Sequence, residues 1–203
     1  MMFPRINRPY PPSLRGDTQA RLLALVGMPG AGKSLLASYL EQQGFPQFRF
    51  GGITMDELER RGWEVTPHNE KIVREEIRAR EGMDAYARRA LPIIQAMLAE
   101  HRAAVIDGLY SFSEYRTLKA EFGPQLVVVA VACDRALRYA RLAARPERPL
   151  TPQEAEERDI AEIESLEKGG PIAIADFTIL NNTTPADVIA ALQRLLDDLN
   201  LRP

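Results

Sequence analysis

The feature that most constrains this chain is a glycine-rich loop between an apolar run and a segment that favours a helix. Residues 27–34 read GMPGAGKS, and they directly follow the apolar run RLLALV at 21–26. A buried parallel strand is apolar on both faces and needs a crossover helix, so this pattern is typical of a β–α unit. We therefore expect a strand over 21–26 and a helix over 33–43 that ends at Gly44.

The residue types in this loop suit the binding of a phosphate chain. Glycines let the backbone curl so that successive N–H groups point at one anion, and the next helix directs its positive end there. The ammonium group of Lys33 reaches the β- and γ-phosphates, and the hydroxyl of Ser34 is a ligand for Mg²⁺. The pattern predicts a nucleoside triphosphate site. The expected contacts from the loop are Gly27, Met28, Pro29, Gly30, Ala31, Gly32, Lys33, Ser34 and Leu35.

Strand-forming and helix-forming segments alternate along the rest of the chain. Further strands are expected over 45–50, 103–107, 126–132 and 175–180. Helices are expected over 54–61, 66–81, 84–100, 111–122, 135–144, 151–166 and 184–199. This α/β alternation requires right-handed crossovers and a parallel sheet covered by helices on both faces.

Two of these helix boundaries depend on local signals. Thr54 and Glu57 are spaced as in a capping box, so we expect a short helix to begin at Thr54 and to end at Gly62. The glycine pair Gly169–Gly170 is expected to terminate the helix over 151–166.

The chain length favours one domain with additions. The sequence has 203 residues, which suits a single α/β domain over 20–203. Helical segments over about 52–100 predict a cap insert, and the proline-broken stretch over about 141–158 predicts a short lid. Four prolines disfavour regular structure within residues 1–19, so we expect a flexible extension there, with an arm that binds a protein partner as the alternative.

Composition excludes several classes of function. The 26 basic and 28 acidic side chains give a net charge of −2, so no general basic field exists to hold nucleic acid. No apolar run approaches the roughly 18 residues of a membrane span, and the first residues have no apolar signal-peptide core. The single cysteine, Cys133, excludes an internal disulfide and is expected to be a small buried residue. We expect a cytoplasmic protein with no membrane partner.

Asp107 is the second candidate for the chemistry. It ends the apolar run AAVI and precedes Gly108. A carboxylate at the C-terminal end of a parallel strand faces the ligand crevice, where it holds Mg²⁺ through water or accepts a proton from an attacking group. The alternative is an acid that caps the next helix, although Ser111 already stands at that cap position.

An arginine-rich segment follows the fourth expected strand. Arg141 and Arg145 are spaced i,i+4 and share a helix face, and Arg158 follows on the next helix. Arginines beside a phosphate loop neutralise charge on a transferring phosphoryl group. The alternative is a solvated face paired with nearby acids. The arginines of the segment are Arg135, Arg138, Arg141, Arg145, Arg148 and Arg158, and the acids are Glu147, Glu154, Glu156 and Glu157.

Binding of a second substrate is expected to involve the cap insert. Arg74, Arg78 and Arg88 are the preferred contacts for a phosphorylated acceptor, although acids at helical spacing, such as Glu70 with Arg74, allow simple ion pairs instead. After the last expected strand, Asn182 is either a contact for the nucleotide base or part of a turn.

Several segments together resemble the nucleoside-monophosphate-kinase-like group of P-loop proteins. They are GMPGAGKS, the helical insert, VIDG at 105–108 and the arginine helix. RRGWEVTPHN at 60–69, ARRALP at 87–92 and ADFTILNN at 175–182 look most like the archaeal adenylate-kinase-related and dephospho-CoA-kinase-like proteins. The resemblance implies a five-stranded sheet of order 2-3-1-4-5 with a cap and a lid. It also implies transfer from ATP to a phosphate-bearing or hydroxyl-bearing small molecule, with Arg141, Arg145 and Arg158 as lid arginines.

Two departures from this group concern the acceptor. Gly51–Gly52 stand where related proteins carry an acid, and Leu109–Ser111 stand where they carry an arginine. We expect an ATP- and Mg²⁺-dependent kinase whose acceptor is a nucleoside monophosphate or a compound like dephospho-CoA. The alternative is a nucleotide-dependent switch or accessory NTPase that acts through a protein partner.

Overall fold

A single five-stranded parallel sheet organises the chain. The computed structural model describes residues 20–203, and the expected extension over 1–19 lies outside the described residues. The strand order is β2-β3-β1-β4-β5, and every neighbouring pair is parallel. The strands are β1 (Arg21–Val26), β2 (Gln47–Arg49), β3 (Ala103–Asp107), β4 (Leu126–Ala132) and β5 (Phe177–Leu180). The expected α/β fold and strand order are therefore confirmed.

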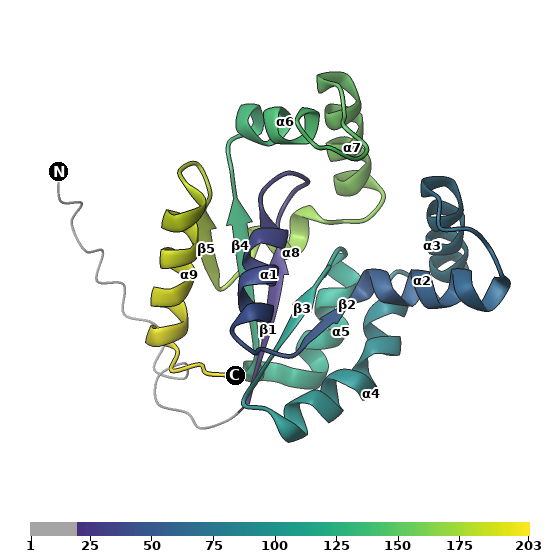
Figure 1. Ribbon diagram of the computed structural model, residues 1–203. Coiled ribbons are helices and arrows are strands. Elements are labelled where there is room, and N and C mark those ends of the chain that lie inside the picture. Colours follow the sequence, from purple (N-terminus) through teal and green to yellow (C-terminus); the bar gives the residue numbers. More distant parts are fainter. Residues whose placement is uncertain (1–19) are drawn as a thin grey trace.

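Helices cover both faces of the sheet (Figure 1). Helices α1 (Lys33–Gln42) and α9 (Pro185–Asp198) lie on one face, and α4 (Ala85–Glu100), α5 (Phe112–Phe122) and α8 (Gly169–Ala173) lie on the other. Side chains of β1 alternate between the two layers, because Leu23 and Leu25 pack with α1 and α9 while Leu22 and Ala24 pack with α4 and α5. This double burial explains why the strand is apolar throughout.

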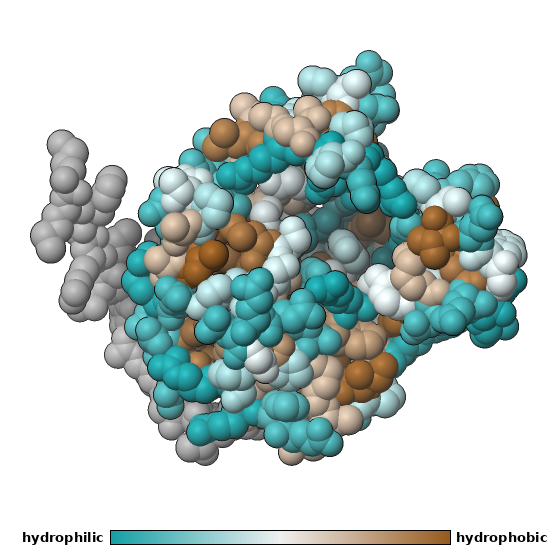
Figure 2. Space-filling view, viewed as in Figure 1, coloured by the Kyte–Doolittle hydropathy of each residue, from teal (hydrophilic) through white to brown (hydrophobic). Residues whose placement is uncertain are grey.

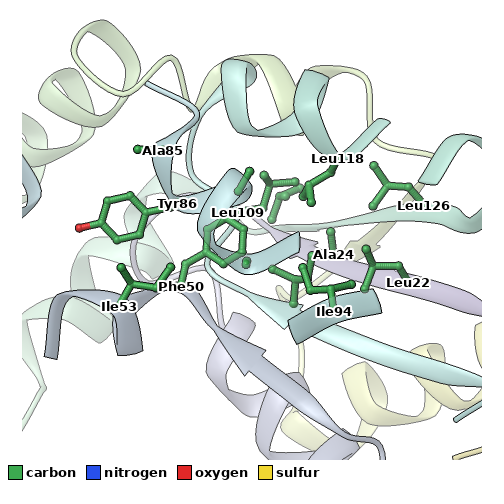
Figure 3. Packing of buried hydrophobic residues seen from close by; sticks show 14 of the residues in the cluster. Leu22, Ala24, Phe50, Ile53, Ala85, Tyr86, Ile94, Leu109, Leu118 and Leu126 are labelled. Carbon is green, nitrogen blue, oxygen red and sulfur yellow. The ribbon is translucent and has the colours of Figure 1, made fainter. Parts of the chain in front are cut away.

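The cap insert between β2 and β3 consists of α2 (Phe50–Arg61), α3 (Pro67–Glu81) and α4. Helices α2 and α3 project beside the sheet (Figure 1), whereas α4 covers one face of it. The side chains of Phe50, Ile53 and Tyr86 join the same buried cluster as Leu109 and Leu118 (Figure 3). The insert is therefore anchored to the sheet by a continuous apolar core rather than by a hinge alone.

Helix α2 begins four residues earlier than the capping-box signal predicts. The helix begins directly after β2, at Phe50, and the side chain of Phe50 is fully buried in the core. Thr54 lies inside the helix, where its hydroxyl is 2.8 Å from the hydroxyl of Tyr86. Glu57 binds Arg60 and Arg61 instead of the helix end. The predicted end is confirmed, since Gly62 adopts a left-handed conformation after Arg61.

Two helices form the lid above the sheet (Figure 1), namely α6 (Arg135–Ala143) and α7 (Pro152–Glu164). Helix α7 ends at Glu164, with Ser165 as its C-cap, so Gly169–Gly170 do not terminate it as predicted. They open the short helix α8 instead. A Cβ atom on Gly170 would lie 2.7 Å from the Phe112 ring, so this glycine allows α8 to approach α5 closely. A 3₁₀ turn, η2 (Gly123–Gln125), connects α5 to β4.

None of the helices within residues 20–203 combines the length and the apolar character that crossing a membrane demands.

Candidate functional site

The glycine-rich loop joins β1 to α1 and packs closely against Arg138 and Asn181. Gly30 and Gly32 have φ angles of 76° and 99°, in the region that favours glycine. A Cβ atom would lie 2.7 Å from the Arg138 carbonyl oxygen at Gly30, and 2.0 Å from Nδ2 of Asn181 at Gly32. Both glycines are therefore required by the curl of the loop and by the side chains packed against it.

Asn181 is the polar anchor of this loop. Its side chain is buried, and its Nδ2 donates a hydrogen bond of 2.8 Å to the carbonyl oxygen of Ala31. The predicted residue, Asn182, is exposed, and its Oδ1 accepts a hydrogen bond of 2.9 Å from the backbone N–H of Asp134. The segment after β5 therefore supports the phosphate loop through its first asparagine and the start of the lid through its second.

A cavity of about 390 Å³ opens above the loop. Figure 2 shows this face hollowed between the lid and the cap, with hydrophilic residues around the opening. Nine predicted residues line the cavity: Pro29, Gly30, Gly32, Lys33, Ser34, Asp107, Arg141, Arg145 and Arg158. Three residues that the sequence did not predict as contacts complete the lining: Tyr110, Glu162 and Lys168. The predicted residues outside this lining are Gly27, Met28, Ala31, Leu35, Asn182, Arg74, Arg78 and Arg88.

Lys33 bends back onto its own loop. Its Nζ donates hydrogen bonds to the carbonyl oxygens of Gly27, at 2.7 Å, and Met28, at 3.3 Å. Burial, together with the nearby charge of Lys168 as the second cause, lowers the pKa of Lys33 to about 7. An anion in the cavity would stabilise the charged form, so the loop is electrostatically prepared for a phosphate chain.

The donor set also fits a magnesium ion. Ser34 and Asp107 line the same cavity and offer a hydroxyl and a carboxylate, which are the oxygen ligands that Mg²⁺ prefers. Among residues 20–203, no group of three or more His, Cys, Asp or Glu side chains forms a closed metal cage. Magnesium ordinarily takes its remaining ligands from water and from substrate phosphates, so this open pair is suitable.

The arginines of the lid have different roles. Nη2 of Arg141 donates to the backbone oxygen of Asn181 at 3.0 Å, which keeps the guanidinium at the cavity wall. Arg158 donates from Nε to Glu162 at 3.2 Å. The solvated alternative holds for Arg135, which is exposed and pairs with Glu156. Arg148 is also exposed, but its partner is Glu70 of the cap insert rather than one of the four acids expected. Of the two remaining arginines, Arg145 lines the cavity and Arg138 is buried.

Arg138 is a structural residue of the lid. Its guanidinium makes two hydrogen bonds with the carboxylate of Asp159, at 3.0 and 2.6 Å. Nη1 also donates to the carbonyl oxygen of Pro29 at 3.0 Å.

Cys133 is partly exposed rather than buried as expected, and its sulfur lies 3.2 Å from Nη1 of Arg141.

The three insert arginines predicted to bind the acceptor are engaged in ion pairs. Arg74 pairs with Glu70 at 3.3 Å, and Arg88 pairs with Asp84. Arg78 lies 3.4 Å from Glu114 and 4.9 Å from the centre of the Tyr86 ring. The alternative that the sequence left open, ion pairing within the helices of the insert, is thus observed for Arg74 and Arg88, whereas Arg78 connects the insert to α5.

Of the two departures near the acceptor side, the one at Leu109–Ser111 has a local structural reason, whereas the one at Gly51–Gly52 lies in open space. Leu109 is fully buried in the core, and Ser111 caps α5 in a capping box with Glu114. An arginine at either position would disrupt these contacts. Gly51 and Gly52 form the first turn of α2, where an added Cβ atom would meet no heavy atom within 4 Å. This turn follows Arg49, which is paired in register with Asp107, so free space lies at the same sheet edge as the acid.

Comparisons of the sequence identify its relatives. Residues 23–162 match a family model described as an AAA domain. A UPF0200 protein of Thermococcus kodakarensis is 34% identical over 181 residues, which cover 88% of this chain and 97% of that protein. A UPF0200/UPF0201 protein of Archaeoglobus fulgidus is 33% identical over 180 residues, and this chain spans about half of it, 55% of its length.

Solved structures agree on the fold. The crystal structure of TT1252 from Thermus thermophilus aligns with a TM-score of 0.62 and 19% identity, over 89% of this chain and 98% of that one. Shikimate kinase from Bacteroides thetaiotaomicron aligns with a TM-score of 0.56 and 16% identity, over 89% and 99% of the two chains. The resemblance to P-loop proteins of the nucleoside-monophosphate-kinase-like group is confirmed, and the chain belongs to the UPF0200 family of P-loop proteins.

Proposed function

We propose that the protein transfers the γ-phosphoryl group of ATP, in a Mg²⁺-dependent reaction, to a small molecule that bears a phosphate or a hydroxyl group. The main support for this proposal is that Lys33, Ser34 and Asp107 line one cavity together with the lid arginines. Five cationic side chains line the cavity against two carboxylates. This excess of positive charge suits a polyphosphate and the charge that spreads over a transferring phosphoryl group.

Each residue has a role that follows from its chemistry. Lys33 and the first amides of α1 hold the phosphates, since α1 has no side-chain cap and no acid in its first turn. Ser34 and Asp107 would hold Mg²⁺, which neutralises charge on the phosphate oxygens when bound. Arg141, Arg145 and Arg158 close over the cavity and exclude water.

The acceptor is proposed to approach from the side of Asp107 and the first turn of α2. There the bond from the γ-phosphorus to the ADP oxygen breaks, and a bond from the γ-phosphorus to the acceptor oxygen forms. A hydroxyl acceptor would pass its proton to Asp107, whereas a phosphate acceptor attacks with an ionised oxygen. Free space at Gly51 and Gly52 supports this side of the cavity for a small molecule. Nucleoside monophosphates and dephospho-CoA are the first acceptors to test.

The test is formation of ADP from MgATP, or of GDP from MgGTP, alone and with each acceptor in a panel of nucleoside monophosphates and coenzyme A precursors. We expect turnover that depends on one acceptor, is lost in Asp107→Asn, and remains in Glu156→Gln, which alters an exposed residue outside the cavity lining. Turnover that is independent of every acceptor, or binding without turnover, would overturn the proposal and favour a nucleotide-dependent switch.

A further inference from the structure

Lys168 is a buried cation in the same cavity as Lys33. It stands at the start of α8, its side chain is 2% exposed, and it lines the cavity above the phosphate loop. Burying a lysine costs free energy, because its ammonium group loses hydration. Two neighbours compensate for that cost here. Nζ of Lys168 is hydrogen-bonded to Glu162, and it lies 4.8 Å from the centre of the Tyr110 ring.

Glu162 is shared between two cations. It accepts hydrogen bonds from Lys168 and from Nε of Arg158, and all three side chains line the cavity. One carboxylate therefore holds two positive groups beside the phosphate loop. A triphosphate that enters the cavity brings several negative oxygens. One of these two cations can therefore bind a phosphate oxygen while the other remains paired with Glu162.

The position of Lys168 places it on the acceptor side of the loop. Its ring contact, Tyr110, belongs to the turn after β3, three residues beyond Asp107. This turn, Gly108 to Ser111, has no cationic side chain of its own, because Leu109 is buried in the core and Ser111 caps α5. Lys168 reaches the same turn from α8, a different part of the chain. Lys168 therefore places a cation over the Tyr110 ring, in a turn that has no cation of its own.

We propose that Lys168 contacts the γ-phosphoryl group of the bound triphosphate on its acceptor-facing side, and that Glu162 holds this ammonium group in place until the nucleotide binds. The inference rests on the proposed function, because it assigns a further substrate contact to the same cavity. Lys33 contacts the β- and γ-phosphates from the loop side, whereas Lys168 meets only the terminal group. Lys168 therefore distinguishes a triphosphate from a diphosphate, and Lys33 does not.

The test compares MgATP and MgADP binding by titration calorimetry. In Lys168→Met, ATP affinity should fall by about tenfold or more, the loss of one charge-assisted hydrogen bond, while ADP affinity changes by no more than about twofold. Lys33→Met should weaken both ligands. Arg135→Met is the matched control, because Arg135 is an exposed lid cation outside the cavity lining, and it should weaken neither.

A double variant separates ligand contact from folding. Lys168→Met leaves Glu162 with Arg158 as its one remaining partner and can destabilise the domain, so Lys168→Met with Glu162→Gln removes the negative charge that Lys168 had balanced. This variant should regain stability in urea and still bind ATP weakly. ATP binding at the wild-type level in the double variant, or an equal loss for ATP and ADP in Lys168→Met, would overturn the inference.

The two proposals fail in different ways. If no acceptor supports turnover but Lys168→Met loses ATP selectively, only the proposed kinase reaction is wrong. If an acceptor is found and the double variant keeps the wild-type kcat and the wild-type KM for ATP, the reaction stands and Lys168 has only a structural role.

Discussion

The guanidinium group of Arg138 and the carboxylate of Asp159 form a buried ion pair that joins the two helices of the lid. Their two hydrogen bonds measure 3.0 and 2.6 Å, and both side chains are about nine-tenths buried. Because Arg138 also donates to the carbonyl oxygen of Pro29, the base of the lid is connected directly to the phosphate loop. The lid arginines are therefore positioned by the same framework that shapes the loop.

We expect Asp159→Ala to destabilise the domain strongly. The substitution leaves the charge of Arg138 buried without its partner, and breaking a buried pair in this way typically costs about 3–5 kcal/mol. Urea unfolding measures the change. Glu156→Ala is the matched control, since it breaks an exposed pair with Arg135 and should cost less than about 1 kcal/mol. Equal effects of the two substitutions would show that the buried pair does not support the lid.

The anchoring role of Asn181 predicts a contrast between neighbouring asparagines. Asn181→Ala removes the hydrogen bond to Ala31 and leaves a backbone oxygen of the loop unsatisfied, which should cost about 1–3 kcal/mol and weaken MgATP binding. Asn182→Ala alters an exposed residue and should leave MgATP affinity within about twofold, on the scale where 1.4 kcal/mol is tenfold. Thermal unfolding and calorimetry measure both effects. A larger loss of ATP affinity in Asn182→Ala would restore the sequence-based expectation that Asn182 contacts the base.

Nucleotide binding should take up a proton above neutral pH. The pKa of Lys33 is lowered to about 7 in the empty site, so at pH 8 most molecules carry it uncharged. Phosphate oxygens favour the charged form and raise this pKa, so each bound triphosphate brings a proton with it. Calorimetry at pH 8 in buffers of different ionisation enthalpy measures the uptake. Lys33→Arg should reduce it, because arginine stays charged in both states.

The same shift makes the stability of the free protein depend on pH. Lys33 has a lower pKa folded, about 7, than its ordinary value of 10.5, so the unfolded chain binds more protons between these two values. The cost of burying the ammonium is therefore largest below pH 7 and declines as the pH rises toward 10.5. Lys33→Met should stabilise the protein most at pH 6 and least near pH 10. A pH-independent difference in urea unfolding would contradict the buried, perturbed lysine.

The sequence predicts the elements that local chemistry determines. The strand, loop and helix from Arg21 to Gln42 follow from one motif and its flanks. The helices expected over 111–122 and 151–166 are observed as α5 and α7, which begin with capping boxes at Ser111 and Thr151. The start of α2 is predicted wrongly because Thr54 and Glu57 satisfy a local pattern, whereas the buried position of Phe50 in the core decides the boundary. Tertiary burial outweighs a capping signal here.

The cavity is predicted only in part, for a related reason. Loop residues, Asp107 and the lid arginines carry patterns of spacing that point to phosphate binding. Lys168 carries none, because the glycines after it suggest only a helix end, and its place depends on how α8 packs against α5. The pairing of Arg138 with Asp159 rather than with a glutamate of the same segment likewise depends on the angle between two helices.

The central claim is that the loop at Gly27–Ser34 holds the phosphates of a nucleoside triphosphate, and calorimetric titration of MgATP tests it most directly. The wild-type protein should bind one MgATP per chain. Lys33→Met should lose most of that affinity while remaining at least as stable at pH 7, because the side chain contacts ligand rather than core. Equal binding of MgATP to the two proteins, or no binding to the wild-type chain, would contradict the account.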